Sequence, residues 1–349
     1  MQKQAANVTI QGVLEYALAT VLRVPDNVIK LRIASRTDTG VHAIVNTATT
    51  VLPPPSTAPK PVLGINPEPP YDPEYVQAAV NHLLWDLDLE VRILGCRIVS
   101  QGFCPRRHAK MRSYLYRLAV LKSEYDRNYG PSLLHNAGTI APLIELDRSW
   151  PLSSNFNKDA FRDVSKMLTG RHNFASFMSD PFRGKKAALW SALTPLPTHR
   201  VIADLSISPG RPLMDPHLEP LCGCFDYYDV IITSTSFLYN QIRRMMAAMV
   251  AVAQERLKLE DIQWLLDNPH HLSWDKYQLE MAPAGGLYLQ NIEYDSNDFD
   301  NPNPDYSTKK DKDAPFEADE EDSGDDELEG EPKRRSWIKK GGRPLSSKT

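Results

Sequence analysis

The sequence has little cysteine and no long apolar run, and each absence excludes a class of protein. Its cysteines stand at positions 96, 104, 222 and 224, and four in 349 residues are too few for a disulfide framework. Cys222-Gly-Cys224 has no second cysteine pair at the spacing of a zinc site, so we interpret it as structural. Apolar stretches are short and interrupted by charge, which excludes a membrane span. These features predict an intracellular protein in a reducing compartment.

The chain also lacks a strong charge of either sign. Its 40 basic and 44 acidic residues give a net charge of −4. Residues 295–349 hold 16 acidic and 10 basic residues, which leaves 30 basic and 28 acidic residues in 1–294. The first 294 residues are therefore mildly basic, which permits an RNA partner. Residues 295–349 are poor in apolar side chains, and we predict a disordered tail that is acidic first and basic at its end.

The most informative run extends from Ser35 to His42 and has an acidic residue at its centre. Thr37-Asp38-Thr39-Gly40 reads as a tight turn between two strand-like segments, 28–33 and 41–51. Gly accepts a positive φ and Asp bonds its own backbone, so the pair favours a turn. The turn would hold Asp38 rigidly between a cation, Arg36, and an imidazole, His42. A rigid turn of this kind can position a catalytic carboxylate. The alternative is that Asp38 only forms the turn, which is the usual role of an Asp at such a position.

Asp-Thr-Gly is also the signature of aspartic proteases, which gives a competing interpretation. Those enzymes need two carboxylates that share a proton. This chain has one Asp-Thr-Gly, preceded by Arg-Thr rather than by an apolar strand end. A protease would therefore require a homodimer.

A second informative stretch, 102–120, leads from basic residues into an aromatic strand. Its basic side chains and imidazole are Arg106, Arg107, His108, Lys110 and Arg112. Guanidinium groups bind phosphate and aromatic faces stack on nucleobases. Period-two alternation places Tyr114, Tyr116, Leu118 and Val120 on one face of the strand. The stretch fits RNA contact, and it equally fits a core strand with a basic edge.

Helix and strand patterns follow along the rest of the chain. We expect helices from Thr9 to Leu22, Glu74 to Leu84 and Asn157 to Leu168, and strands at 89–99, 227–237 and from Thr198. A further helix begins near 238–246, and its buried stripe is Ile242, Met245, Met246, Met249, Val250 and Ala253. Arg243 flanks that stripe in the first turn, where the helix dipole disfavours a cation. This position hints at a carboxylate partner for Arg243.

Taken in order, several of these motifs resemble the TruA family of tRNA pseudouridine synthases, from about Thr9 to Leu289. The matching segments are 9–11, 36–42, 112–116, 170–177, 237–243 and 282–289. Ser35-Arg36-Thr37-Asp38, Tyr114 to Leu118 and Ser236 to Tyr239 are most similar to the eukaryotic branch called pseudouridine synthase-like 1. The resemblance implies an α+β fold of two α/β half-domains, with largely antiparallel sheets joined into one curved surface around a basic cleft and helices outside.

The resemblance also implies a reaction and a set of site residues. Uridine in tRNA would become pseudouridine without a cofactor or metal, and the sequence has no P-loop, dinucleotide fingerprint or credible metal constellation. Asp38 would be the catalytic carboxylate, paired with Arg243, whose charge lowers the pKa of Asp38. Tyr114 would stack on the uracil, Leu287 would line the base pocket, and Arg36 and His42 would contact RNA or buttress the turn. The implied half-domains are 1–145 and 146–294, with the tail at 295–349.

One departure from the family leaves an alternative open. Family members begin with a strand carrying a Tyr-Asp-Gly-like motif before the helix that starts here at Thr9, and this sequence lacks it. Its loss would weaken the first half-domain, through a truncated gene model or a natural short form. A non-catalytic RNA-binding relative is therefore the alternative to a synthase. By resemblance we expect a mitochondrial protein, with nucleus and cytoplasm also open, and a monomer or a homodimer.

Overall fold

The computed structural model describes residues 8–25, 27–52, 71–100, 102–126, 138, 140–179 and 197–300. The chain divides into two compact units, Met1–Asp313 and Ala314–Thr349, and every described residue belongs to the first. The fold is a mixture of sheets and helices, as the sequence predicts. The proline-dense segment 53–70 lies outside the described residues.

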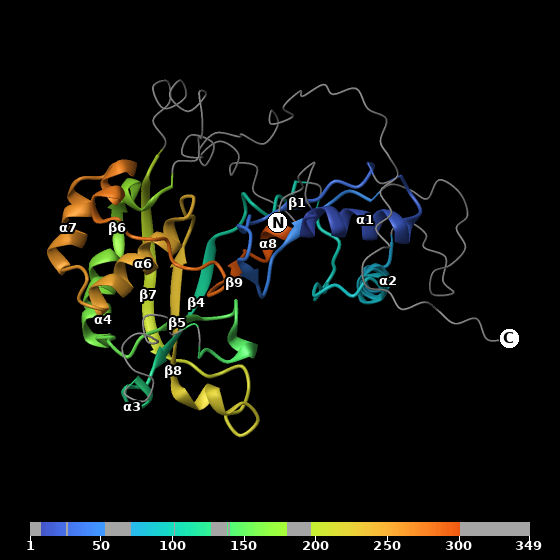
Figure 1. The fold of residues 1–349 in the computed structure, drawn as a ribbon. Coiled ribbons are helices and arrows are strands. Elements are labelled where there is room, and N and C mark those ends of the chain that lie inside the picture. Colours follow the sequence, from blue (N-terminus) through green and yellow to red (C-terminus); the bar gives the residue numbers. More distant parts are fainter. Residues whose placement is uncertain are drawn as a thin grey trace, which may run out of the picture. The chain divides into compact units, whose positions relative to one another are not determined.

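A mixed sheet built around β4 (Met111–Leu121) forms the centre of the fold (Figure 1). The strand order is β2-β9-β4-β8-β7-β6, and β5 pairs with β4 outside this path. The other strands are β2 (His42–Ala43), β5 (Trp150–Leu152), β6 (Gly170–Asn173), β7 (His199–Pro209), β8 (Phe225–Ser234) and β9 (Leu287–Glu293). All pairs are antiparallel except β2 with β9 and β5 with β4. The strands predicted from Thr198 and from 227 are confirmed as β7 and β8.

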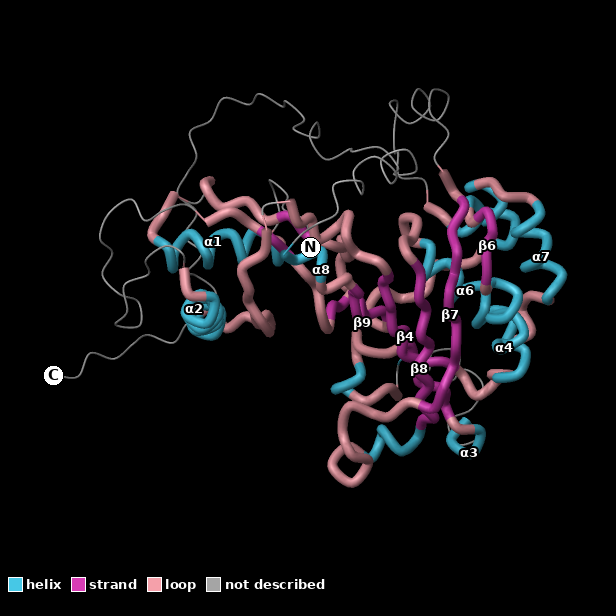
Figure 2. The backbone as a smooth tube through the Cα atoms, turned by 180° about the vertical axis from the view of Figure 1, so that it is seen from behind, coloured by secondary structure: helices cyan, strands magenta, loops and turns pink. Residues whose placement is uncertain are grey.

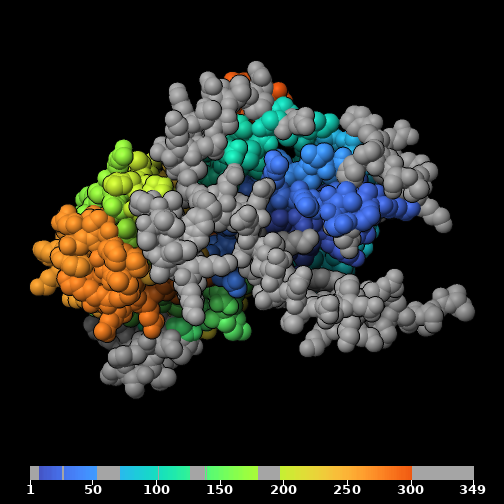
Figure 3. All heavy atoms as spheres, turned by 90° about the horizontal axis from the view of Figure 1, so that it is seen from above, coloured from blue at the N-terminus to red at the C-terminus, as the bar shows by residue number. Residues whose placement is uncertain are grey.

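Helices α4 (Lys158–Leu168), α6 (Gln241–Ala253) and α7 (Leu259–Asp267) pack together on one face of this sheet (Figure 2). The predicted stripe of α6 is confirmed, since every one of its members is buried in the same core as β4, β8 and β9. Asn157 caps α4 through its side-chain oxygen, which accepts from the amides of Asp159 and Ala160. The outer surface of α7 and of η5 (His271–Tyr277) is the orange area in Figure 3.

The N-terminal elements have a core of their own. Helices α1 (Ile10–Leu22) and α2 (Pro73–Asp86) pack their apolar faces together, and both predicted helices are confirmed. Thr9 caps α1, as its Oγ1 accepts from the Gly12 amide at 3.2 Å. A two-stranded ladder joins β1 (Arg32–Ile33) to β3 (Ala48–Thr49). Short helices complete the described fold: α3 (Ser123–Asp126), η2 (Leu143–Glu145), η3 (Ala175–Phe177), η4 (Pro220–Cys224) and α8 (Asn297–Asp300).

The strand predicted at 89–99 is not a strand in the structure. This segment is irregular, and within the described residues no strand pairs with it. Side chains of α2 take the place of a partner strand: Asn81 Nδ2 donates to the Ile93 carbonyl at 2.9 Å, and the Ile93 amide donates to Asn81 Oδ1 at 2.7 Å. Gln77 Nε2 also donates to the Ile93 carbonyl, at 3.2 Å, so the backbone groups of Ile93 are satisfied without a ladder.

The start of the predicted tail is ordered. Residues 297–300 form α8, and Phe299 packs against Phe103 and Tyr294 with ring centroids 5.0 and 5.8 Å away. The prediction of disorder from 295 is therefore wrong for these first residues, because an aromatic side chain and a cation–π contact from Arg97 anchor them. Residues 301–349 lie outside the described residues. The half-domain boundary at 145 stays a prediction, and β2 and β4, which precede it, share a sheet with the strands that follow it.

Candidate active site

The predicted turn at Asp38 is present and is held by tertiary contacts. The Val41 amide donates to the Asp38 carbonyl at 3.1 Å, and Gly40 has a φ of +80°, where a side chain would be strained. A Cβ atom at Gly40 would lie 3.2 Å from Cβ of Ala284, so the turn packs closely on the segment before β9. Ala34 is buried in the main core at the start of the run. Asp38 is therefore fixed by the body of the protein on both sides.

Burial and one cation set the ionisation of Asp38. Burial raises the pKa of Asp38 above its usual 3.8, and the charge of Arg243 opposes this by lowering it. Arg243 lowers the pKa of Asp38 as predicted, and burial, which is the larger effect, leaves the pKa raised. Among the described residues Asp38 makes no ion pair within 4.0 Å. Arg243 instead donates from Nε to the Ala282 carbonyl at 2.8 Å.

Tyr114 lies within the electrostatic reach of Asp38, and its ring is fixed from two sides. Its hydroxyl shares a hydrogen bond of 3.2 Å with Ser35 Oγ, three positions before the carboxylate. Phe237 packs edge-on against the ring at 5.3 Å. The charge of Asp38 contributes to raising the pKa of Tyr114, after burial, which is the larger cause. A bulge in the pairing of β4 with β9 falls between Ser113 and Tyr114.

Leu287 lies at the start of β9, next to Tyr116 rather than Tyr114. It is buried, and it follows a tight turn in which the Leu287 amide donates to the Ala284 carbonyl at 3.0 Å. Tyr116 donates its hydroxyl to the Pro283 carbonyl at 2.6 Å, and a Cβ atom at Gly286 would lie 2.7 Å from the Tyr116 ring. The turn before β9 therefore has little room to move.

His42 is engaged by the protein itself. Its Nε2 donates to the Asp147 carbonyl at 2.6 Å, and its ring stacks on Tyr288 with centroids 4.7 Å apart. These contacts match the predicted alternative in which His42 buttresses the turn. Arg36 is exposed. The structure thus places Asp38 within the electrostatic reach of Arg243 and Tyr114, without the predicted direct pair between Asp38 and Arg243, and His42 begins β2 just after the same turn.

The basic run before β4 divides into a buried part and a surface part. Arg112 is buried and donates to three carbonyls, those of Thr235 at 2.7 Å, Arg106 at 3.0 Å and Ala34 at 3.2 Å. It therefore ties the Asp38 run to β4 and to the segment before α6, and it does not present its charge to phosphate. His108 is also buried. Lys110 pairs with Asp295 at 2.7 Å, and Arg106 and Arg107 are exposed.

Sequence reasoning missed the residues that hold the site by long-range contacts. Ser35 fixes the Tyr114 hydroxyl, and Asn46 in turn donates to the Ser35 carbonyl at 2.8 Å. Asp147 contributes only its backbone, at a φ of 55°. No local pattern marks these positions, because each acts on a partner many residues away.

The described part of the chain contains no group of three or more His, Cys, Asp or Glu residues that could hold a metal ion. Within that same part, no helix combines the length and apolarity that crossing a membrane requires.

Comparisons with known proteins agree on one family. The sequence profile described as tRNA pseudouridine synthase matches residues 164–295, which include Arg243 and Leu287. The tRNA pseudouridine synthase-like 1 of Xenopus laevis is 32% identical over 288 residues, 82% of each chain, and that of Homo sapiens is 30% identical over 271 residues, 76% of this chain and 75% of the human one. A tRNA pseudouridine synthase A of Methylacidiphilum infernorum is 26% identical over 294 residues, 84% of this chain and 89% of its own.

Proposed function

Because this chain belongs to the TruA family of pseudouridine synthases, on the eukaryotic synthase-like 1 branch, we propose that it isomerises uridine in tRNA with Asp38 as the catalytic carboxylate. The observation that carries the proposal is the half-buried Asp38, fixed on its turn within the electrostatic reach of both Arg243 and Tyr114. Retention of all three residues supports an enzyme over a non-catalytic RNA-binding relative.

The reaction balances without a co-reactant. The C1′–N1 bond of uridine breaks, the uracil turns, and a C1′–C5 bond forms; N1 gains a proton and C5 loses one. Nothing is oxidised or reduced, so the proposal needs no cofactor. An ionised Asp38 serves either as the nucleophile at C1′ or as the base on a glycal-like path. Both routes need a carboxylate that is charged at neutral pH, and the guanidinium of Arg243 favours that form.

The other site residues have positioning roles in this proposal. The charge of Arg243 favours the ionised form of Asp38. The ring of Tyr114 stacks on the uracil and holds it while the glycosidic bond is broken. Leu287 lines the base pocket from behind the turn at Gly286. Arg36 contacts the RNA backbone, and His42 buttresses the turn.

The RNA substrate must present its uridine outside the base stack. Unstacking costs a few kcal/mol, which phosphate contacts offset, and bends and loops of tRNA are suited to it. We place the RNA in a basic cleft where two half-domains form one curved sheet surface. The number of subunits around that cleft, one or two, is open to measurement by light scattering.

The test uses unmodified tRNA transcripts and three proteins: the wild type, Asp38→Ala and Asp163→Asn. Asp163 is an exposed acid on α4, paired with Lys166, and serves as a matched control. Carbodiimide treatment and primer extension map pseudouridine as new stops. We expect stops with the wild type and with Asp163→Asn but not with Asp38→Ala, whose tRNA affinity should stay unchanged. Full activity of Asp38→Ala would refute the mechanism.

The proposed compartment is the mitochondrion, on resemblance to the branch. Expression of the tagged chain with organelle markers tests it, and a signal confined to nucleus or cytoplasm would contradict it.

A further inference from the structure

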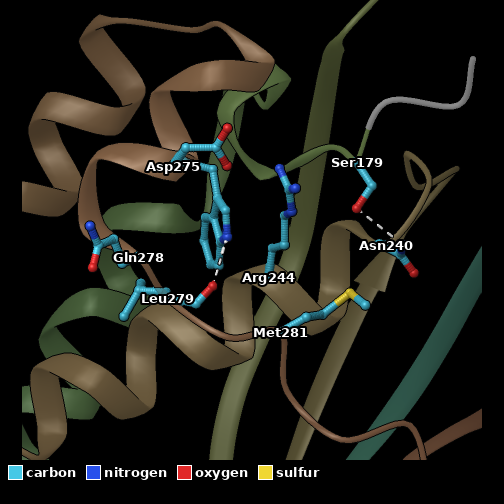
Figure 4. A pocket seen from close by; sticks show the side chains of 8 residues that line it. Ser179, Asn240, Arg244, Asp275, Gln278, Leu279 and Met281 are labelled. Atoms are coloured by element: carbon cyan, nitrogen blue, oxygen red, sulfur yellow. Dashed lines mark hydrogen bonds between the residues drawn. The ribbon is translucent and has the colours of Figure 1, made fainter. Parts of the chain in front are cut away.

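A polar cavity of about 460 Å³ lies beside the first turn of α6, one residue along the helix from Arg243 (Figure 4). Its lining includes Arg244, Trp274, Ser179 and Asn240. Successive residues of an α-helix point about 100° apart, so Arg243 and Arg244 serve different partners. The cavity is thus next to the Asp38 site but separate from it.

Arg244 lines this cavity, and protein carbonyls hold one nitrogen of its guanidinium. Its Nη1 donates to the Met178 carbonyl at 2.7 Å and to the Ser176 carbonyl at 3.4 Å, and the group lies over Trp274 at 5.0 Å. Among the described residues, Nε and Nη2 of Arg244 donate no hydrogen bond, and the side chain makes no ion pair within 4.0 Å. Nε and Nη2 share one edge of the guanidinium. Two parallel donors on one edge fit two oxygens of a phosphate.

The charge of Arg244 is only weakly compensated inside the protein. Burial lowers the pKa of Arg244, and the carboxylate of Asp275 opposes this effect. Asp275 is exposed. Figure 4 shows Arg244 between Asp275 on one side and Ser179 and Asn240 on the other, so an anion at the Ser179 side is kept away from the acid. A partly desolvated guanidinium of this kind gains most from an anion that enters the cavity.

Asn240 and Ser179 line the cavity on that side and are bonded to each other. Asn240 has a φ of 60°, and its Nδ2 donates to Ser179 Oγ at 3.1 Å. The cavity therefore places the guanidinium fork of Arg244 beside uncharged polar side chains, which leave room for a phosphate without a competing charge.

We propose that this cavity binds the RNA backbone next to the target nucleotide, with a phosphate on Arg244. The proposal rests on the proposed function, because it assigns a substrate contact to the same enzyme. The cavity would thus fix the backbone while Asp38 acts on the extruded nucleotide.

The first experiment measures affinity for an unmodified tRNA transcript at several salt concentrations. Arg244→Gln removes the charge and Arg244→Lys keeps it without the fork, while Arg162→Gln, at an exposed position of α4, is the control. We expect Arg244→Gln to reduce the slope of log affinity against log salt by about 0.7–0.9, the value for one phosphate contact. Arg244→Lys should keep the slope and bind more weakly. Wild-type affinity and slope for Arg244→Gln would overturn the proposal.

Arg244→Lys also covers the case in which Arg244→Gln does not fold. If Arg244→Lys folds and binds the transcript with wild-type affinity, the two-donor contact to phosphate is wrong.

Two controls separate the failures. Binding of tRNA does not require catalysis, so the affinity of a chain without synthase activity can still confirm or overturn the phosphate contact. The formation of pseudouridine tests the proposed function separately. Inorganic phosphate is the probe for a free anion. If phosphate saturates the wild type but not Arg244→Gln, and both bind tRNA equally, the cavity holds a free anion and the RNA contact is overturned.

Discussion

Gly285 lies so close to Asp147 that a Cβ atom at Gly285 would be 2.5 Å from the Asp147 carbonyl oxygen. The same carbonyl accepts from Nε2 of His42 at 2.6 Å. One backbone group thus meets both the turn before β9 and the end of the Asp38 run. The Asp147 carbonyl therefore helps to set the relative position of the two turns. It thereby also helps to set the distance between Asp38 and the residues around it.

Gly285→Ala should therefore lower both stability and activity. The added methyl meets backbone rather than a flexible side chain, and overpacking of this kind costs about 1–3 kcal/mol. Gly95→Ala is the matched control, because a Cβ atom there meets nothing within 4 Å. Urea unfolding and the tritium released from C5-labelled uridine in tRNA measure the two effects. Equal stability of the two variants would show that the Asp147 segment moves freely.

The activity of the enzyme should fall in acid at a pH above the ordinary Asp value of 3.8, since burial raises the pKa of Asp38. Arg243 opposes that rise, so Arg243→Gln should move the acid limb of kcat/KM to higher pH. Arg243→Lys, which keeps the charge, should move it less. A pH–rate profile from about 4 to 8 measures this. An unchanged limb in Arg243→Gln would mean that the titrating group is not Asp38.

The same pKa gives a stability prediction of defined sign. The stabilising contribution of a protonated Asp38 is fully present below pH 3.8 and is lost as pH rises through the raised pKa of the folded state. At pH 7 the carboxylate is therefore a net cost. Asp38→Asn should unfold at the wild-type temperature or higher while catalysis falls by at least about 10²–10⁴-fold. A large drop in melting temperature would contradict this.

Tyr114 should act through its ring more than through its hydroxyl. Tyr114→Phe loses only the bond to Ser35, worth about 0.5–1.5 kcal/mol, so kcat/KM should fall by about tenfold at most. Tyr114→Leu keeps an apolar side chain but loses base stacking, worth about 1–3 kcal/mol, and should lose more activity. Tyr228→Leu, which removes a ring that packs on Phe156, is the control for a lost aromatic. Equal activities of the Phe and Leu variants would exclude stacking.

Local patterns sufficed for the elements that depend on local chemistry. Three such features were predictable: the stripe of α6, the Thr9 cap of α1 and the turn at Gly40. Each depends on residues that are close together in the sequence. The segment around Ile93 was not, since its alternation indicates a strand while α2 side chains satisfy its backbone. A strand-like sequence pattern indicates a preference for extended backbone, but a strand forms only where a neighbouring strand pairs with it.

The charge pattern before β4 left two interpretations open for a related reason. In the sequence Arg112 cannot be told apart from its exposed basic neighbours. In the fold it is surrounded by three carbonyls and connects the segments that carry them. The lowering effect of Arg243 on the pKa of Asp38 was predictable, but the larger, opposite effect of burial was not, because burial cannot be read from residue types. Sequence motifs thus indicate which residues belong to one site. How deeply each residue is buried becomes known only from the structure.

Arg117 and Glu145 should be far more important for stability than any surface ion pair. Their side chains are 8% and 0% exposed, and Arg117 Nη1 lies 2.8 Å from Glu145 Oε2. Glu145→Gln leaves a buried guanidinium without its counter-charge, which typically costs about 3–5 kcal/mol. Asp159→Asn breaks the exposed pair with Arg162 and should cost about 0–1 kcal/mol. Urea unfolding compares them, and similar values would show that the buried pair is not needed.

His42 offers a choice between two roles that binding data can separate. If it buttresses the turn, His42→Phe keeps the stack on Tyr288, loses the bond to Asp147, and lowers kcat by about tenfold at most, with tRNA affinity and its salt dependence unchanged. If it contacts the RNA backbone, affinity falls and the salt slope decreases. Arg36→Gln is the comparison, because this exposed cation should change the slope without changing kcat. We expect the buttress, since Nε2 of His42 already bonds Asp147 and its ring already stacks on Tyr288. A reduced slope in His42→Phe at unchanged kcat would assign His42 to the RNA instead.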